Sequence, residues 1–175
     1  MMKRLFLLRH AKAVAADAHT EDSARVLAER GRSDALRMGE YLRKTHGMPD
    51  LVLCSTAART METWQLASRA FETLPKVQFM DALYLAPWSA ILKLARAAPD
   101  NAASLLIIGH NPGMENLADI LAREPKGSSE KRRANSLEEK FPTAALAVFH
   151  FDAQKWKNIA AGEGVLADFR RPKDI

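Results

Sequence analysis

The sequence predicts an α/β domain with a mostly parallel central sheet, helices on both faces and an antiparallel strand at its C-terminal edge. Short apolar runs alternate along the chain with longer segments whose apolar residues recur every three or four positions. The short runs are apolar throughout, which is typical of parallel strands that are covered on both faces. A chain of 175 residues fits a single domain of this class, spanning 1–175.

Four apolar runs are interpreted as parallel strands, namely RLFLL at 4–8, DLVLC at 50–54, VQFM at 77–80 and SLLII at 104–108. The segments between and after them have the apolar spacing of helices, at about 28–46, 55–71, 87–98 and 112–123. Two further runs, 144–151 and 164–169, have no convincing helix between them. They therefore predict the antiparallel strand at the edge of the sheet.

Composition excludes several classes of protein. Cys54 is the only cysteine, so an intramolecular disulfide is impossible, and we expect it to be buried and inert. None of the five histidines has the spacing of a metal-ligand motif, so we expect no metal and no cofactor. The apolar run near the N-terminus has four residues, whereas a signal peptide needs roughly 7–15. These features predict a cytoplasmic protein with no membrane partner.

The charged residues are concentrated in one segment. The formal net charge is +5, which allows acidic partners, but no nucleic-acid partner is expected. Segment 124–140 mixes both signs of charge around Gly127 and is predicted to be a mobile surface loop outside the catalytic machinery. Whether its basic residues bind an acidic partner protein is left open.

Polar residues follow three of the predicted strands. Arg9 and His10 follow the first strand, Ser55 follows the second with Arg59 one helical turn later, and His110 follows the fourth. In an open α/β sheet, ligands bind at the carboxyl ends of the strands, so these side chains should converge on one crevice.

The expected crevice has the chemistry of a phosphoryl site. Arginine guanidinium groups pair with phosphate oxygens, and a neutral histidine nitrogen can attack phosphorus. A single histidine at a strand end is usually structural, but the convergence of two arginines and two histidines favours an anion site. His19, His46 and His150 lack this context, and we expect them to be structural.

Blocks of sequence along nearly the whole chain resemble the histidine phosphatase superfamily, which is phosphoglycerate mutase-like in fold, and within it the small SixA-type phosphohistidine phosphatases. The blocks are LLRHAKA at 7–13, LAERGRSDALRMGEYL at 27–42, PDLVLCSTAARTMET at 49–63, LLIIGHNPGMENLA at 105–118 and FPTAALAVFHF at 141–151. Ala11 stands where the superfamily has glycine, and Val26 and Ala28 stand where many relatives have proline and threonine.

The resemblance implies a role for each site residue. His10 would be the phosphorylated nucleophile, Arg9 and Arg59 the phosphate clamp, and His110 the second histidine, which binds and polarises the phosphoryl group. Asp81 lies where the superfamily often has an acidic proton donor, and Glu115 and Asp22 are its rivals.

The resemblance also implies a phosphatase with a covalent phosphohistidine intermediate and without a metal. Only 48 residues separate His10 from Arg59, and 50 separate Arg59 from His110, which leaves no room for a large helical cap. An open site suits protein phosphohistidine as the substrate. Two alternatives stay open, a phosphatase of small phosphate esters and a non-catalytic module that binds phosphoproteins.

Overall fold

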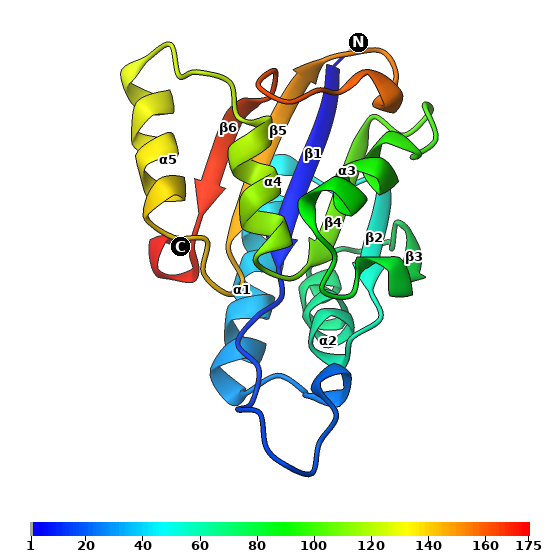
Figure 1. Ribbon diagram of the computed structural model, residues 1–175. Coiled ribbons are helices and arrows are strands. Elements are labelled where there is room, and N and C mark those ends of the chain that lie inside the picture. Colours follow the sequence, from blue (N-terminus) through cyan, green and yellow to red (C-terminus); the bar gives the residue numbers. More distant parts are fainter. Residues whose placement is uncertain (1) are drawn as a thin grey trace.

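A computed structural model describes residues 2–175 and confirms the predicted α/β architecture (Figure 1). The sheet has six strands in the order β3-β2-β4-β1-β5-β6. Their bounds are β1 Met2–Arg9, β2 Leu51–Ser55, β3 Lys76–Met80, β4 Ser104–Gly109, β5 Leu146–Asp152 and β6 Val165–Arg170. Strands β1 to β4 pair in parallel, whereas β5 pairs antiparallel with both β1 and β6. The antiparallel C-terminal edge is therefore present as predicted.

Five α-helices cover the sheet within the described chain. They are α1 Glu29–His46, α2 Ala58–Ala67, α3 Trp88–Arg96, α4 Gly113–Leu121 and α5 Ser128–Glu139. One face of the sheet packs against α3, α4 and α5, and the opposite face packs against α1 and α2. Alternate residues of each strand point to opposite faces, so Leu7 joins the first layer and Leu8 the second. Both faces are covered, which explains the continuous apolar runs.

Helix α5 corrects the prediction of a loop over 124–140. The segment is too polar to show a helical apolar face, and Leu137 is its only fully buried residue within the helix. Tertiary contacts supply what the pattern lacks. Leu137 joins the core, Arg133 Nε donates to the carbonyl oxygen of Leu166 at 2.8 Å, and Arg123 pairs with Glu130 at 3.1 Å.

The register of the sheet determines where the polar strand ends meet. Strands β1 and β4 are parallel neighbours, and Arg9 lies opposite Gly109. The backbone N–H of His10 donates to the carbonyl oxygen of Gly109 at 3.0 Å. His10 and His110 therefore leave adjacent strands at the same level of the sheet. Strand β2 lies on the other side of β4, which places Ser55 beside the same edge.

Glycine lets α1 approach the segment that follows His10. A Cβ added to Gly31 would lie 2.0 Å from the carbonyl oxygen of Lys12, which is far inside contact distance. The N-terminal turn of α1 therefore packs directly on the backbone of this segment. This close contact between backbones holds the segment after His10 in place against α1.

No helix in the described part of the chain is long and apolar enough to span a lipid bilayer.

Candidate active site

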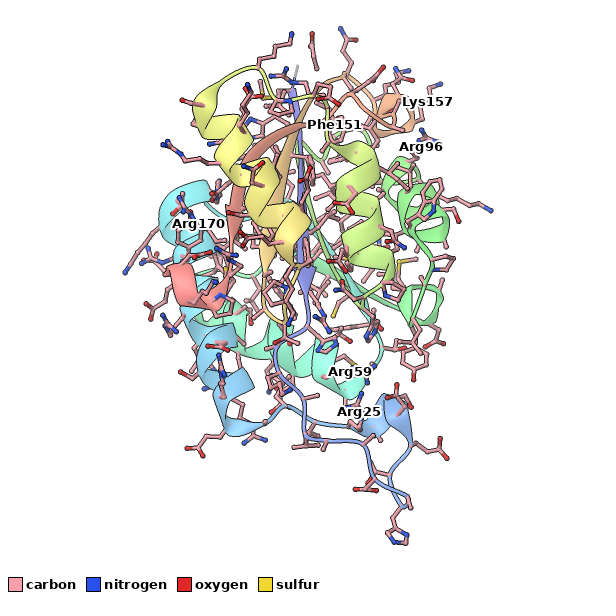
Figure 2. The ribbon with its side chains drawn as sticks, turned by 60° about the vertical axis from the view of Figure 1, so that its left-hand side comes forward. Arg25, Arg59, Arg96, Phe151, Lys157 and Arg170 are labelled. Atoms are coloured by element: carbon pink, nitrogen blue, oxygen red, sulfur yellow. The ribbon has the colours of Figure 1, made fainter. Side chains whose placement is uncertain are left out.

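The structure brings Arg9, His10, Arg59 and His110 together around one cavity of about 350 Å³ at the carboxyl ends of the strands. The sequence analysis predicted this convergence. Larger hollows elsewhere on the surface contain none of these four residues. The further residues that line this cavity are Lys12, Ala13, Asp22, Arg25, Leu85, Asn111 and Thr143. Figure 2 shows Arg25 and Arg59 at the same end of the molecule.

The backbone of the next residue orients the ring of His10. Its Nδ1 lies 2.7 Å from the carbonyl oxygen of Ala11. Because a carbonyl oxygen can only accept a hydrogen bond, Nδ1 carries the proton and Nε2 carries a free lone pair. Burial, with smaller contributions from the positive charges of Arg59 and Arg9, lowers the pKa of His10 to about 4, although the Ala11 hydrogen bond acts to raise it. The ring is therefore neutral at pH 7.

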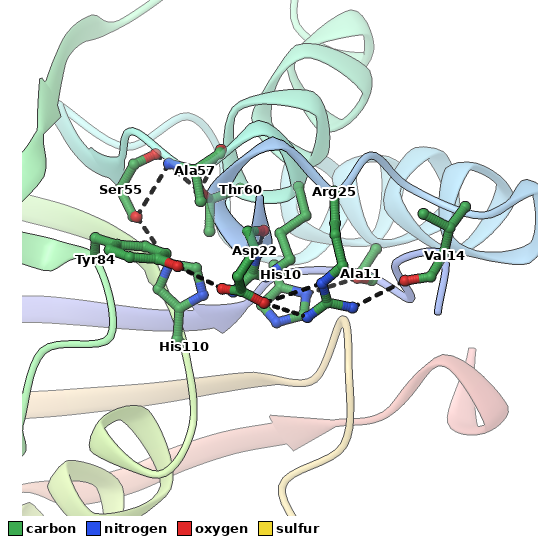
Figure 3. Close-up of polar contacts among 11 residues, drawn as sticks. His10, Ala11, Val14, Asp22, Arg25, Ser55, Ala57, Thr60, Tyr84 and His110 are labelled. Atoms are coloured by element: carbon green, nitrogen blue, oxygen red, sulfur yellow. Dashed lines mark hydrogen bonds and ion pairs between the residues drawn. The ribbon is translucent and has the colours of Figure 1, made fainter. Parts of the chain in front are cut away.

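His110 faces His10 across the cavity, with 5.3 Å between the centres of the two rings. Its Nε2 lies 2.8 Å from the buried hydroxyl of Ser55 at the end of β2. Its Nδ1 is buried and has no partner among residues 2–175, and Figure 3 shows that side of the ring turned toward His10. Burial, followed by the nearby His10 and Arg59, lowers the pKa of His110 to about 3.

Two arginines provide positive charge beside these rings, and one of them is fully buried. Arg9 extends from the end of β1, and its Nη1 donates to the carbonyl oxygen of Phe141 at 3.1 Å. Arg59 lies in the first turn of α2 and is only 2% exposed. The Nε atom of each has no partner within the described residues. Buried guanidinium N–H groups without partners are suited to an anionic ligand that enters the cavity.

The three candidate acids occupy different environments. Asp81 is not among the residues that line the cavity, and its carboxylate accepts a hydrogen bond from Thr56 Oγ1 at 2.6 Å. Glu115 accepts from the backbone N–H of Phe141 at 3.2 Å and is also absent from the lining. Only Asp22 lines the cavity. The role of Asp81 as an acid therefore stays a prediction that this geometry does not support.

Asp22 is held firmly in its ionised form. The hydroxyl of Tyr84 donates to its carboxylate, which also pairs with Arg25 at 2.9 Å (Figure 3). The same carboxylate pairs with Arg59 at 3.1 Å. The Tyr84 hydrogen bond, followed by those of Arg25 and Arg59, holds the pKa of Asp22 well below its usual range despite the opposing effect of desolvation. A carboxylate held in this way has no proton to donate at neutral pH.

Sequence reasoning missed Arg25, Tyr84 and Lys12. Arg25 and Lys12 line the cavity, and Tyr84 packs against the ring of His110 with 5.4 Å between ring centres. The spacing of Asp22 and Arg25, three residues apart, is compatible with a local ion pair. No local pattern indicates that this pair lies against Arg59, which is more than 30 residues away in sequence.

No group of three or more histidine, cysteine, aspartate or glutamate side chains within residues 2–175 is placed to hold a metal ion. Cys54 is buried as predicted, and burial raises the pKa of its thiol to about 12.

The pattern of residues and the fold identify the family. A family model described as histidine phosphatase superfamily (branch 1) matches residues 5–136, and the chain belongs to this superfamily.

Solved structures agree with this assignment. The structure assigned to phosphohistidine phosphatase SixA of Nakamurella multipartitia is 27% identical, with a TM-score of 0.84, and the match covers 98% of this chain and 97% of that one. The corresponding SixA structure of Agrobacterium tumefaciens is 32% identical, with a TM-score of 0.79 and coverage of 97% and 98%. A protein histidine phosphatase SixA complexed with tungstate shares the fold, at 20% identity, a TM-score of 0.75 and coverage of 97% of each chain.

Proposed function

We propose that this protein is a phosphatase in which His10 attacks the phosphoryl group and water then hydrolyses the phosphohistidine intermediate. The observation that carries the proposal is the state of His10. Its Nδ1 proton is donated to Ala11, and its free Nε2 belongs to a cavity that Arg9 and Arg59 also line. A neutral imidazole nitrogen beside fixed positive charge is the arrangement that phosphoryl transfer to nitrogen requires.

The proposed reaction consists of two displacements at phosphorus. Nε2 of His10 forms a bond to phosphorus while the bond from phosphorus to the leaving group breaks, and that electron pair departs with the leaving group. Arg9 and Arg59 neutralise the charge on the equatorial oxygens, which is the main catalytic requirement in phosphoryl transfer, and the neutral ring of His110 donates its remaining proton to one of these oxygens. Water then attacks phosphorus, releases inorganic phosphate and returns the lone pair to His10.

The leaving group decides which substrate this cavity suits. An alkyl ester leaves as an alkoxide, which needs a proton, and Asp22 is the one carboxylate of the described chain that lines the cavity and is held ionised. A phosphohistidine can carry a proton on its second ring nitrogen, because free imidazole titrates near ~6.5. Its imidazole can then leave as a neutral group. We therefore propose protein phosphohistidine as the substrate. The tungstate complex of the SixA neighbour, which contains a tetrahedral oxyanion, supports an oxyanion-binding cavity of this type.

The test is a comparison of kcat/KM for a phosphohistidine-bearing protein, an aryl phosphate and an alkyl phosphate. We expect the phosphohistidine protein to be hydrolysed fastest and the alkyl phosphate slowest. A brief incubation with phosphorus-labelled substrate should leave an acid-labile label on the wild-type chain and none on a His10→Ala variant.

A matched control is His19→Ala, which removes a histidine from an exposed loop and should leave labelling and turnover unchanged. Faster hydrolysis of the alkyl phosphate would favour a phosphatase of small esters. Binding without any covalent label would favour a non-catalytic module.

A further inference from the structure

Arg25 lies in the same cavity as His10 and Arg59, although it comes from the irregular segment between β1 and α1. Figure 3 shows its guanidinium group next to the carboxylate of Asp22, on the side where His10 lies. The Arg25 side chain is only 20% exposed, which is low for an arginine in a surface loop. The structure therefore contains a third arginine in the cavity besides the two in the proposed clamp.

The guanidinium group of Arg25 is held in place by three contacts to two acceptor atoms. Its Nη1 donates to the carbonyl oxygen of Val14 at 2.8 Å. Its Nε and Nη2 both lie against Oδ1 of Asp22, at 3.0 Å and 2.9 Å. A guanidinium group has five N–H donors, so these contacts leave two free. An arginine held in this way loses little side-chain entropy when it binds a ligand.

Asp22 connects the two arginines. Its Oδ1 pairs with Arg25, and its Oδ2 accepts from Arg59 Nη2 at 3.1 Å. Its backbone carbonyl oxygen also accepts from Arg59 Nη1 at 2.8 Å. One carboxylate therefore faces two guanidinium groups, so these three groups together have a net positive charge. The charge of Arg25 also acts on His10, where it is one of the influences that lower the pKa of the ring.

We propose that Arg25 is a third phosphoryl-binding arginine, which donates hydrogen bonds to the oxyanion held between Arg9 and Arg59. This inference rests on the proposed function and adds a binding residue to the proposed clamp. The ligand chemistry is that of a tetrahedral oxyanion with two negative charges. Lys12 also lines the cavity, so four cations and one carboxylate surround the ligand.

The test is direct binding of tungstate and of inorganic phosphate, measured by titration calorimetry. A hydrogen bond to a charged group implies that Arg25→Ala should weaken tungstate binding by about 10- to 100-fold. Arg25→Lys keeps the charge but loses the forked geometry, and it should restore only part of the affinity. Arg30→Ala is the matched control, because Arg30 is an exposed arginine of α1 that does not line this cavity, and it should bind as the wild type does.

Three outcomes would contradict either the role of Arg25 or the proposed function. Wild-type affinity in Arg25→Ala, with the same melting temperature, would overturn the role of Arg25 and leave the proposed function intact. Full affinity in Arg25→Lys would show that a positive charge is sufficient at this position and would overturn the role of the forked guanidinium group. A wild-type chain that binds neither anion would count against the proposed function itself, and the role of Arg25 would fail with it.

Discussion

The hydroxyl of Ser55 lies 2.8 Å from Nε2 of His110, and both side chains are buried. The Ser55 oxygen already accepts a weak hydrogen bond from the backbone N–H of Ala57 at 3.4 Å. Its own proton is therefore available for His110, which has a pKa far below neutral. This arrangement puts the remaining ring proton of His110 on Nδ1, the atom on the side turned toward His10 in Figure 3.

We expect Ser55→Ala to lower turnover by about 10-fold or more, because a buried ring nitrogen loses its partner and the tautomer of His110 is no longer determined. The measurement is kcat on an aryl phosphate together with thermal unfolding. Ser104→Ala removes an equally buried hydroxyl at the opposite end of the sheet, so it should affect stability without affecting kcat. Equal losses of kcat in the two variants would show that Ser55 contributes only to stability.

Because the ring of His10 is neutral at pH 7, we expect it to take up a proton only in acid. Its ring resonance in proton NMR should titrate near pH 4, because burial and the neighbouring arginines disfavour the charged ring. A His10→Gln variant identifies the resonance. Since the folded pKa lies below the value of ~6.5 expected after unfolding, the unfolded chain binds the proton first. This group therefore makes the fold less stable as the pH falls from ~6.5 to 4. A titration midpoint near ~6.5 would contradict the proposed state of the nucleophile.

An Asp81→Asn variant tests whether Asp81 is the proton donor. Its carboxylate accepts a hydrogen bond from Thr56, and it does not line the cavity. We therefore expect Asp81→Asn to keep the hydrolysis of both aryl and alkyl phosphates within a few-fold of wild type, whereas loss of a general acid typically costs ~10²–10⁴-fold. If alkyl phosphate hydrolysis alone fell by that amount, Asp81 would be the proton donor after all.

Leu137 is the main anchor of α5. It is 3% exposed and is the one fully buried side chain of that helix. Leu137→Ala should reduce the free energy of unfolding by about 2–5 kcal/mol, measured by urea denaturation. Turnover of a small substrate should change little, because no residue of α5 lines the cavity. Arg132→Ala, an exposed change in the same helix, should be nearly neutral for stability. A loss of turnover in the folded Leu137→Ala protein would show that α5 supports the site.

The sequence by itself determined the fold class and predicted four residues of the candidate site, which line one cavity in the structure. Burial on both faces of a parallel sheet demands continuous apolar runs, and those runs are visible at Leu5–Leu8 and at 104–108. Parallel strands carry their carboxyl ends to the same edge, so the positions of His10 and His110 predict that they converge. These inferences need only local patterns and a general rule of sheet topology.

The tertiary structure decided everything that depends on contacts between distant segments. Asp22 begins a short 3₁₀ helix between β1 and α1, and Arg25 follows it. Only the packing of this segment against Arg59 brings both residues into the cavity. Asp81 follows a strand as the site residues do, yet β3 is an edge strand and its carboxylate pairs with Thr56 instead. Helix α5 lacks an apolar stripe and is held by Leu137 and by a hydrogen bond from Arg133 to Leu166 in β6. Local propensity carries no information about such contacts, because each partner lies tens of residues away.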